Sequence, residues 1–566
     1  MDDTSLTYSP HLSWPEEDKT PTTEREIRGF YSYGIAAEVF AVVGVGAFLP
    51  VTLEQLAREN GVLFSDKSTP CVLPKVSQAF SARASDSTRD PDQCLIHLLG
   101  TDTTTASFAM YTFSLAVLCQ ALVLISFSSF ADHGDNRKRL LLTFGTVGSL
   151  ASMSFVFVMP SIYLAGAVLA IIGIVCLGSS FVVLNSFLPL LAANHPSVLN
   201  TQKERQSNTL HDSDNNLELQ ISTKISAEAI GLGYAAALLV QVLAIGVLLS
   251  MKKIFDDSIS ATVPLRLILF LAGIWWLAFM GPTALWLRKR PGPPLKDLKI
   301  DASRTKMARI LAHVAFAWSS LWRTITVALR LKQMVIFLAA WFLLSDAQAS
   351  VSGTAVLFAR TELKIGTVGI ALLSITVMIF GIVGASLLPV LSKRMRWTNS
   401  QTIVFCLVLM EFVPLYGLLG YLPFIQQWGF GGLQVWWEIY GLGVIFGTVI
   451  GGLSSYCRSL FGSFVPPGSE AAFFALFAIT DKGSSAIGPA VVGRIVDATG
   501  HIRPAFWFLA VVVALPIPLI WYTDVNEGQL DARRMAVSLR EDQRFGVQLR
   551  AVERREQAEG LLENEG

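Results

Sequence analysis

Five ionisable residues lie inside long apolar stretches of the sequence. Glu38, Asp346 and Glu411 lie in three separate stretches, and Asp481 and Lys482 are neighbours in another. A charged side chain at the centre of a membrane-spanning helix costs about 2.5–3.5 kcal/mol on insertion scales, so these residues are candidates for ligand binding or ion coupling. A carboxylate would bind an ammonium group or a proton, and a lysine would bind a carboxylate.

The composition indicates that the helices around these residues span a membrane. The chain has 566 residues, of which 52% are hydrophobic and only 15% are charged, and its mean hydropathy is +0.51. An average soluble domain has about 25% charged residues. The net charge of +1 also argues against a nucleic-acid partner, which requires a concentrated basic surface.

We expect an all-α, polytopic membrane protein with twelve transmembrane helices in two six-helix halves. A spanning helix needs about 20 consecutive apolar residues. Twelve windows are long enough: 33–56, 106–130, 140–159, 163–190, 228–250, 265–287, 333–357, 366–391, 401–421, 433–456, 470–495 and 504–523. The predicted organisation is a tail (1–32), a first half (33–287), a linker (288–332), a second half (333–524) and a tail (525–566).

The distribution of Lys and Arg predicts that both tails are cytosolic, because cytoplasmic loops retain basic residues. Most basic residues fall in the tails, the linker and the loops on the same side, and Arg458 counts among them. On this side we expect a flexible insert at 191–227 and, within the linker, an amphipathic helix on the membrane surface.

The opposite side carries one long hydrophilic loop, 57–105. It contains Cys71 and Cys94, whose separation permits a disulfide in an oxidising compartment; two free thiols are the alternative.

No enzyme or cofactor site is expected. The six cysteines have no CxxC spacing, and the seven histidines form no HExxH pair. Neither a GxxxxGK[ST] phosphate loop nor a GxSxG nucleophile turn is present. Zinc binding, ATP hydrolysis and serine hydrolase chemistry therefore have no support, and gradient-driven transport remains.

The two halves share a repeated feature. In each half the loop after the second span is short and basic, SSFADHGDNRKR at 128–139 and LSKRMRW at 391–397. Parallel repeats of this kind are typical of transporters whose substrate site lies between the halves near the bilayer midplane.

The segment ADHGDNRKR at 131–139 resembles the loop between the second and third helices of the major facilitator superfamily, although Ser128 replaces the leading Gly of that pattern. The resemblance implies that Asp132, Arg137 and Arg139 help to close a cytosolic gate.

Two longer segments are similar to the fungal vacuolar amino-acid effluxers of the autophagy-related class, which are divergent members of that superfamily. They are EVFAVVGVGAFLPVTLEQLARENG at 38–61 and PPGSEAAFFALFAITDKGSSAIGP at 466–489. The resemblance implies a multi-pass protein of the vacuole membrane that exports leucine and other neutral amino acids to the cytosol after autophagic degradation. It also implies that loop 57–105 faces the vacuole lumen.

A zwitterionic amino acid needs an acidic group for its ammonium and a cation for its carboxylate. Glu38 or Asp346 would serve the first need and Lys482 the second. Each of these three acids also has a structural interpretation. Glu38 would contact a polar neighbour, Asp346 would form a helix–helix hydrogen bond, and Glu411 would be a protonated acid without a function. Asp481 and Lys482 are not expected to pair with each other, because adjacent residues of a helix point about 100° apart.

Two further carboxylates have structural interpretations. Glu438 is expected in an interfacial aromatic belt, and Glu470 at the positive end of a helix. Proton coupling is left open, and protein partners are unknown. Alternative functions are a sugar or drug transporter of the same fold and a non-transporting membrane receptor or scaffold.

Overall fold

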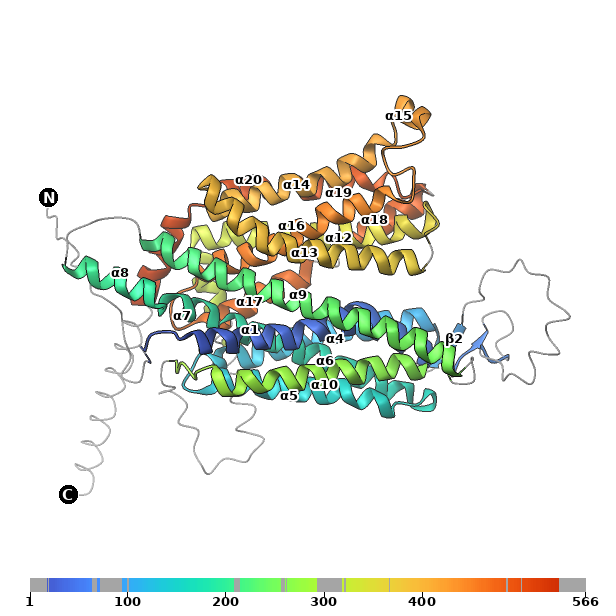
Figure 1. Ribbon diagram of the computed structural model, residues 1–566, viewed down its shortest axis with the longest axis horizontal. Helices are drawn as coiled ribbons and strands as arrows, with labels where there is room; N and C mark the ends of the chain where they lie inside the picture. The colour runs from blue at the N-terminus through green and yellow to red at the C-terminus, as the bar shows by residue number, and fades with distance from the viewer. Residues whose placement is uncertain are drawn as a thin grey trace, which may run out of the picture.

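The computed structural model describes residues 18, 20–63, 69–71, 94–98, 101–207, 214–255, 260, 262–292, 318–319, 322–365, 367–484, 487–499 and 501–538. Nearly all of these residues are helical. Figure 1 shows two groups of roughly parallel helices side by side, one made from α1 to α10 and the other from α12 to α20.

The first half contains one long span of mixed helix type, several continuous helices and a small sheet. The span comprises α1 (Glu24–Val39), the π-helix η1 (Phe40–Phe48) and α2 (Leu49–Arg58). The sheet contains β1 (Val62–Leu63), β2 (Cys94–Leu98) and β3 (Thr101–Thr104). The remaining helices are α4 (Thr105–Ala131), α5 (Asn136–Ser154), η2 (Phe155–Phe157), η3 (Pro160–Ile162), α6 (Tyr163–Asn185), α7 (Phe187–Ala193), α8 (Pro196–Ser207), α9 (Asp214–Phe255) and α10 (Thr262–Trp286).

The second half contains continuous helices and two interrupted ones. The continuous helices are α12 (Lys332–Thr361), α13 (Thr367–Met395), α14 (Asn399–Leu419) and α16 (Glu438–Ser463), with the short α15 (Pro423–Trp428) between the last two. The interrupted ones are the pair α17 (Glu470–Ser484) and α18 (Ile487–Thr499), and the pair α19 (Ala505–Ala514) and α20 (Pro516–Trp521).

The helical membrane fold is confirmed, whereas the count of twelve spans is not. Within the described part of the chain, ten helices are long and apolar enough to cross a membrane, and an eleventh is obtained if the bent pair Ala505–Trp521 and Val525–Ser538 is one span. The remaining window, 470–495, corresponds to α17 and α18. The twelfth span therefore depends on these two helices acting as one interrupted span, which stays a prediction.

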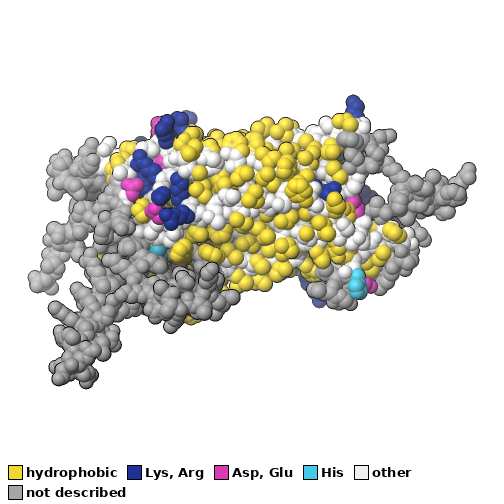
Figure 2. Space-filling model, turned by 90° about the horizontal axis from the view of Figure 1, so that it is seen from below, with side chains coloured by type: hydrophobic (Ala, Val, Ile, Leu, Met, Phe, Trp, Pro, Cys, Tyr) yellow, Lys and Arg dark blue, Asp and Glu magenta, His cyan; other side chains and the backbone are white. Residues whose placement is uncertain are grey.

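The surface has the character of a lipid-facing protein. Figure 2 shows hydrophobic side chains gathered over the middle of the molecule, with charged side chains toward its two ends. Exposed apolar residues on five different helices contribute to this belt: Leu118, Val168, Leu387, Phe412 and Val511. Because lipid tails offer these side chains an apolar environment, such a belt is expected of a spanning bundle.

The interior is divided between the two halves. Buried apolar side chains form two clusters, one centred on each half. In the first half, Trp276 is fully buried and stacks on Phe40 with ring centroids 5.2 Å apart. The halves meet where α9 packs against α13 and α16, and where α4 and α6 pack against α17. These contacts surround the interface in which a substrate site is expected.

Glycines allow the closest helix contact of the second half, between α13 and α16. A Cβ atom on Gly451 would lie 2.0 Å from the carbonyl oxygen of Gly381, and one on Gly384 would lie 2.0 Å from that of Thr448. Small residues at such positions let membrane helices approach until their backbones touch.

The segment 191–227, which joins two spans of the first half, is more helical than predicted. The expected flexible insert 191–227 is mostly helix, because α7, α8 and the first turns of α9 occupy 191–207 and 214–227. Buried side chains near the start of α9, among them Leu219, Thr223 and Ser226, stabilise the helix beyond its apolar span.

The linker is partly described. Residues 322–330 are helical and present both buried Val327 and exposed Trp322, as an amphipathic helix does. Residues 293–317 lie outside the described part.

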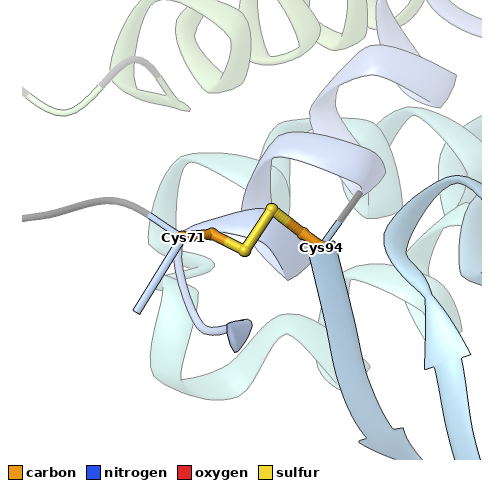
Figure 3. Close-up of a disulfide and its surroundings, with 2 residues drawn as sticks. All are labelled: Cys71 and Cys94. Carbon is orange, nitrogen blue, oxygen red and sulfur yellow. A yellow bond between two sulfur atoms is a disulfide. The ribbon is translucent and has the colours of Figure 1, made fainter. Parts of the chain in front are cut away.

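The end of the molecule opposite α7 and α8 carries the three-stranded antiparallel sheet, in the order β1-β2-β3 (Figure 1). We call it the hairpin end. Cys71 and Cys94 form a disulfide there, shown in Figure 3. It ties the segment after β1 to the start of β2, beside the pairing of Leu63 with Cys94. Of the two alternatives for these cysteines, the structure has the bonded one.

The glycine contact predicts a position-specific loss of stability. Gly451→Ala should destabilise the protein by about 1–3 kcal/mol, the usual cost of overpacking, because its methyl group would meet the Gly381 carbonyl. Thermal unfolding in detergent, followed by the loss of the monodisperse protein, measures the effect. Gly441→Ala is the matched control in the same helix, since a Cβ there meets nothing within 4 Å. Equal melting of the two variants would contradict the packing described.

Candidate functional site

A buried charge cluster joins the two halves at the end opposite the hairpin. The Nη2 atom of Arg137 lies 3.0 Å from Asp132 Oδ1 and 3.0 Å from Glu470 Oε2. All three side chains are about 3–4% exposed. Asp132 and Arg137 belong to the α4–α5 loop and the start of α5, whereas Glu470 begins α17 of the other half. We call Asp132, Arg137 and Glu470 the latch, and this end of the molecule the latch end.

The latch includes the first backbone amides of α17. Ala471 and Ala472 donate their N–H groups to Asp132 Oδ1 and Oδ2 at 2.7 and 2.8 Å. Asp132 therefore compensates the positive end of a helix from the opposite half. Burial raises the pKa of the Asp132 carboxyl to about 7, although Arg137 and the two amides favour its charged form. Separating the halves would expose this carboxyl to water and remove its two contacts with the backbone amides of α17.

The latch differs in one member from the predicted gate residues. Arg139 was predicted to act with Asp132 and Arg137, but its side chain is exposed and lies outside the cluster. Two positions along α5 correspond to about 200° of rotation, so Arg137 and Arg139 face nearly opposite directions. Glu470 takes the third place, and its Oε1 also accepts the Gly468 N–H at 3.0 Å. It thus combines the expected helix-terminal role with an ion pair across the halves.

A second buried pair supports the latch from the first half. Arg290, just after α10, donates from Nε and Nη2 to the two carboxylate oxygens of Glu26, each at 2.9 Å. Its other bonds reach the carbonyl oxygens of Asp18 and Thr20 and the hydroxyl of Thr22. A bidentate, fully bonded guanidinium of this kind holds the N-terminal segment and the start of the linker together.

The central interface contains a carboxylate and a guanidinium from different halves. Glu38 lies at the end of α1, packed against Gly233 of α9, and accepts no hydrogen bond from a described residue. Arg458 lies in α16, and its charge interacts with that of Glu38 without a direct ion pair. Tyr234 of α9 lies within reach of both charges. All three side chains are partly buried.

Arg458 was expected in a cytosolic loop, and the structure corrects this. It lies inside α16 and crosses to the first half, where it donates to Ser226 Oγ at 2.9 Å, the Ser226 carbonyl at 3.1 Å and Asn185 Oδ1 at 3.1 Å. These partners are neutral oxygens, so the positive charge of the guanidinium is not cancelled by a contact ion pair. Its sequence signal was its position in α16, five residues before the end of a helix whose one other charged residue is Glu438 at its start.

The other predicted residues gather where α12 meets α17 and α18. Asp346 is buried, and its Oδ1 accepts the Gly488 N–H at 2.7 Å. The hydroxyl of its neighbour Ser345 donates to Asp481 Oδ1. Asp481 also forms an ion pair with Lys482 at 3.2 Å, contrary to the expectation that adjacent residues do not pair.

The two halves repeat one arrangement and use it differently. Glu38 and Asp346 each lie fourteen residues into the first span of their half, which begin at Glu24 and Lys332. At 1.5 Å per residue, this is about 21 Å from the latch end. Each acid also packs against a glycine of another helix, Gly233 in α9 and Gly488 in α18. α9 is continuous there, so its amides are committed to the helix. α18 begins at Ile487, so the Gly488 N–H is free to bind Asp346.

Glu411 and Glu438 lie apart from both groups. Glu411, in α14, has one buried oxygen without a described partner and shares a helix stripe with the exposed residues Val408, Phe412 and Leu415. Glu438 was expected in an interfacial belt but is buried, and it accepts the backbone N–H groups of Gly431, Leu433 and Gln434. Since these bonds organise the α15–α16 loop, Glu438 is a structural residue.

The described residues contain no group of three or more His, Cys, Asp or Glu side chains placed to hold a metal ion. The charged groups of the interface contact each other, backbone amides and hydroxyls. Such groups suit a small polar or zwitterionic ligand.

A family model described as vacuole effluxer Atg22 like matches residues 22–533. The chain belongs to this family. It is 55% identical to autophagy-related protein 22 of Botryotinia fuckeliana (strain B05.10) and 51% identical to autophagy-related protein 22-2 of Neosartorya fischeri, in both cases over 92% of each chain. The resemblance found in the sequence is thereby confirmed.

Solved structures show the same fold. The proton:xylose symporter XylE covers 89% of this chain with a TM-score of 0.54 at 12% identity, and 96% of that protein is matched. A bacterial homologue of the iron transporter ferroportin, in an outward-facing state, covers 88% with a TM-score of 0.53 at 11% identity, and 99% of it is matched. The protein is therefore a multi-pass transporter of the vacuole membrane with the major facilitator fold.

The latch predicts which arginine of α5 keeps the effluxer closed. Arg137→Ala leaves Asp132 and Glu470 buried without their cation, and breaking a buried pair in this way costs about 3–5 kcal/mol. We expect the latch end to open. A cysteine introduced as Ala472→Cys, which is buried in the closed latch, should then react much faster with a membrane-impermeant maleimide. Arg139→Ala, two residues away and exposed, should react like the parent; similar labelling of both variants would refute the latch.

Proposed function

We propose that this effluxer exports neutral amino acids from the vacuole lumen to the cytosol by alternating access. Both termini and the latch end face the cytosol, and the hairpin end faces the lumen. The basic loops of the latch end support this orientation, and so does the Cys71–Cys94 disulfide at the hairpin end, since disulfides persist in oxidising compartments.

The observation that carries the substrate class is the pair of unlike charges at the central interface. Glu38 accepts no bond from a described residue, and Arg458 bonds only neutral oxygens among its described partners. An amino acid brings an ammonium for Glu38 and a carboxylate for Arg458. Both groups would then form charge-assisted hydrogen bonds, which are about twice as strong as neutral ones.

This assignment replaces Lys482 by Arg458 as the carboxylate partner. Lys482 forms an ion pair with Asp481, whereas Arg458 presents a planar guanidinium that suits a carboxylate. Asp346 is also a poorer candidate for the ammonium, since one of its oxygens is bonded to Gly488. A neutral sugar would not require two unlike charges, so the pair favours amino acids over sugars.

The latch indicates which end of the transporter is closed in this conformation. Asp132, Arg137 and Glu470 join the halves at the latch end. With that end in the cytosol, this state is closed to the cytosol. Release of the substrate then requires separation of the latch and rocking of one half against the other.

Counterflow of labelled leucine in proteoliposomes tests the substrate assignment. Glu38→Gln and Arg458→Ala each remove one charge-assisted contact worth about 1.5–3 kcal/mol. We expect each to lower the apparent affinity by about 10- to 100-fold. Arg458→Lys should retain part of the affinity because it keeps the charge.

Glu411→Gln is the matched control, since it neutralises an embedded carboxylate remote from the pair. It should exchange leucine like the parent protein. If Glu38→Gln and Arg458→Ala also exchange normally, the site is elsewhere. If a panel of labelled amino acids shows no exchange by the parent protein, the proposed substrate class is wrong.

A further inference from the structure

The joint between α17 and α18 is held by one carboxylate. α17 ends at Ser484 and α18 begins at Ile487, and Asp346 of α12 accepts the Gly488 N–H through Oδ1. A charged carboxylate at this place stabilises the positive end of α18. A Cβ on Gly488 would lie 1.8 Å from Ser350 Oγ and 2.8 Å from Asp346 Oδ2. Glycine is therefore needed for α18 to reach these two side chains.

Two buried hydroxyls beside Asp346 have no hydrogen-bond partner in the described part of the chain. Ser350 and Thr354 follow Asp346 at intervals of four residues, so the three side chains form one stripe along α12. They are 6%, 0% and 2% exposed in chain order. Among the described residues, neither Ser350 Oγ nor Thr354 Oγ1 has a hydrogen-bond partner.

This lack of partners is unusual for helical hydroxyls. Such groups commonly bond the carbonyl four residues before them, as Thr376 does with Leu372 at 2.9 Å and Thr480 with Leu476 at 3.1 Å. A buried, unpartnered polar group is costly and calls for an explanation. Ser350 lies next to the unused Oδ2 of Asp346. It can donate to the carboxylate and can accept the O–H of the protonated acid.

The charged groups around Asp346 are few. Of the helices packed against α12, α17 contributes the ion pair of Asp481 and Lys482, and α18 contributes Arg494 and Asp497 farther along the helix. α19 and α20 contain no titratable residue. α13 carries only Lys393 and Arg394, at its latch end. The titratable residues of α16 are Glu438, Tyr440, Tyr456, Cys457 and Arg458.

We propose that Asp346 is the proton-coupling site of the transporter, with Ser350 and Thr354 as its hydroxyl relay toward the lumen. The inference rests on the function and orientation proposed above and adds the coupling ion to it. In that orientation α12 runs from the cytosol to the lumen, so the two hydroxyls lie one and two turns on the lumenal side of Asp346. A proton from the acidic lumen forms an O–H bond on Asp346 and is later released to the cytosolic solution.

Protonation at Asp346 acts on the latch through α17 and α18. The neutral acid no longer stabilises the positive end of α18, so the joint loosens. The other end of α17 carries Glu470 and the amides of Ala471 and Ala472, which hold Asp132. One interrupted span thus connects the proton site to the cytosolic latch, and acid in the lumen favours opening toward the cytosol.

A labelling experiment without substrate tests this switch in sealed vesicles. The protein carries Ala472→Cys, the cytosolic side is kept at constant neutral pH, and only the lumenal pH is lowered. Constant cytosolic pH prevents titration of Asp132 from contributing. We expect the rate of cytosolic maleimide labelling to rise about fivefold or more on lumenal acidification, the lower range of typical coupling between sites.

Three variants give sharp expectations. Asp346→Asn, which mimics the neutral acid and retains an acceptor for Gly488, should label rapidly at both lumenal pH values. Ser350→Ala should need a more acidic lumen for the same response. Glu411→Gln, the control carboxylate, should behave like the parent. An Asp346→Asn protein whose labelling still follows the lumenal pH would overturn the proposal.

Leucine transport separates this inference from the proposed function. Asp346→Asn should retain leucine counterflow at equal pH, within about twofold, and should lose the stimulation of leucine efflux by an acidic lumen. Retained stimulation would refute the coupling site and leave the amino-acid site intact. If the parent protein exchanges no leucine, the proposed substrate fails, whereas the labelling experiment still decides whether Asp346 is the proton switch.

Discussion

The conformation depends on one guanidinium shared by two carboxylates. Arg137 bonds Asp132 of its own half and Glu470 of the other half, and all three are removed from water. A buried charge without its partner is costly, so the cluster is either fully assembled or fully opened to solvent. Asp132 also accepts hydrogen bonds from the first backbone amides of α17. The closed end of the molecule is thus determined by an all-or-none contact rather than by gradual packing.

α17 and α18 connect this contact to the middle of the protein. The first turn of α17 is held by the latch, and the start of α18 is held by Asp346. A continuous helix would have no free amide at Gly488, so the break itself creates the binding place for the carboxylate. The corresponding helix of the first half, α9, has no break, and no described residue donates a hydrogen bond to Glu38. The equivalent acid and glycine of the two halves therefore make different contacts.

The membrane fold and the first list of site residues were predictable because the bilayer penalises charge in proportion to depth. Apolar windows predicted ten of the observed long helices, and every embedded acid was found by the same reasoning. The residues near the ends of windows were harder to interpret. Arg458 was assigned to a loop, and Glu438 to an aromatic belt, because sequence distance from a window end does not reveal which neighbouring helix a long side chain reaches. The insert 191–227 was misread since its polar residues are stabilised by packing on the second half, which local composition does not report.

By itself, the sequence determined a helical membrane protein in two halves, the family to which it belongs and the small set of charges placed where they are costly. The fold and the costly charges follow from composition and periodicity, which act locally along the chain, whereas the family follows from the resemblance of segments 38–61 and 466–489 to its members. Only the tertiary structure decided the pairings: Arg137 with Glu470, which takes the place expected for Arg139, Arg458 opposite Glu38, and Asp346 on the Gly488 amide at the start of α18. Each pairing joins residues more than 100 positions apart in the sequence. Their identity depends on the packing of whole helices and not on the local pattern of residues.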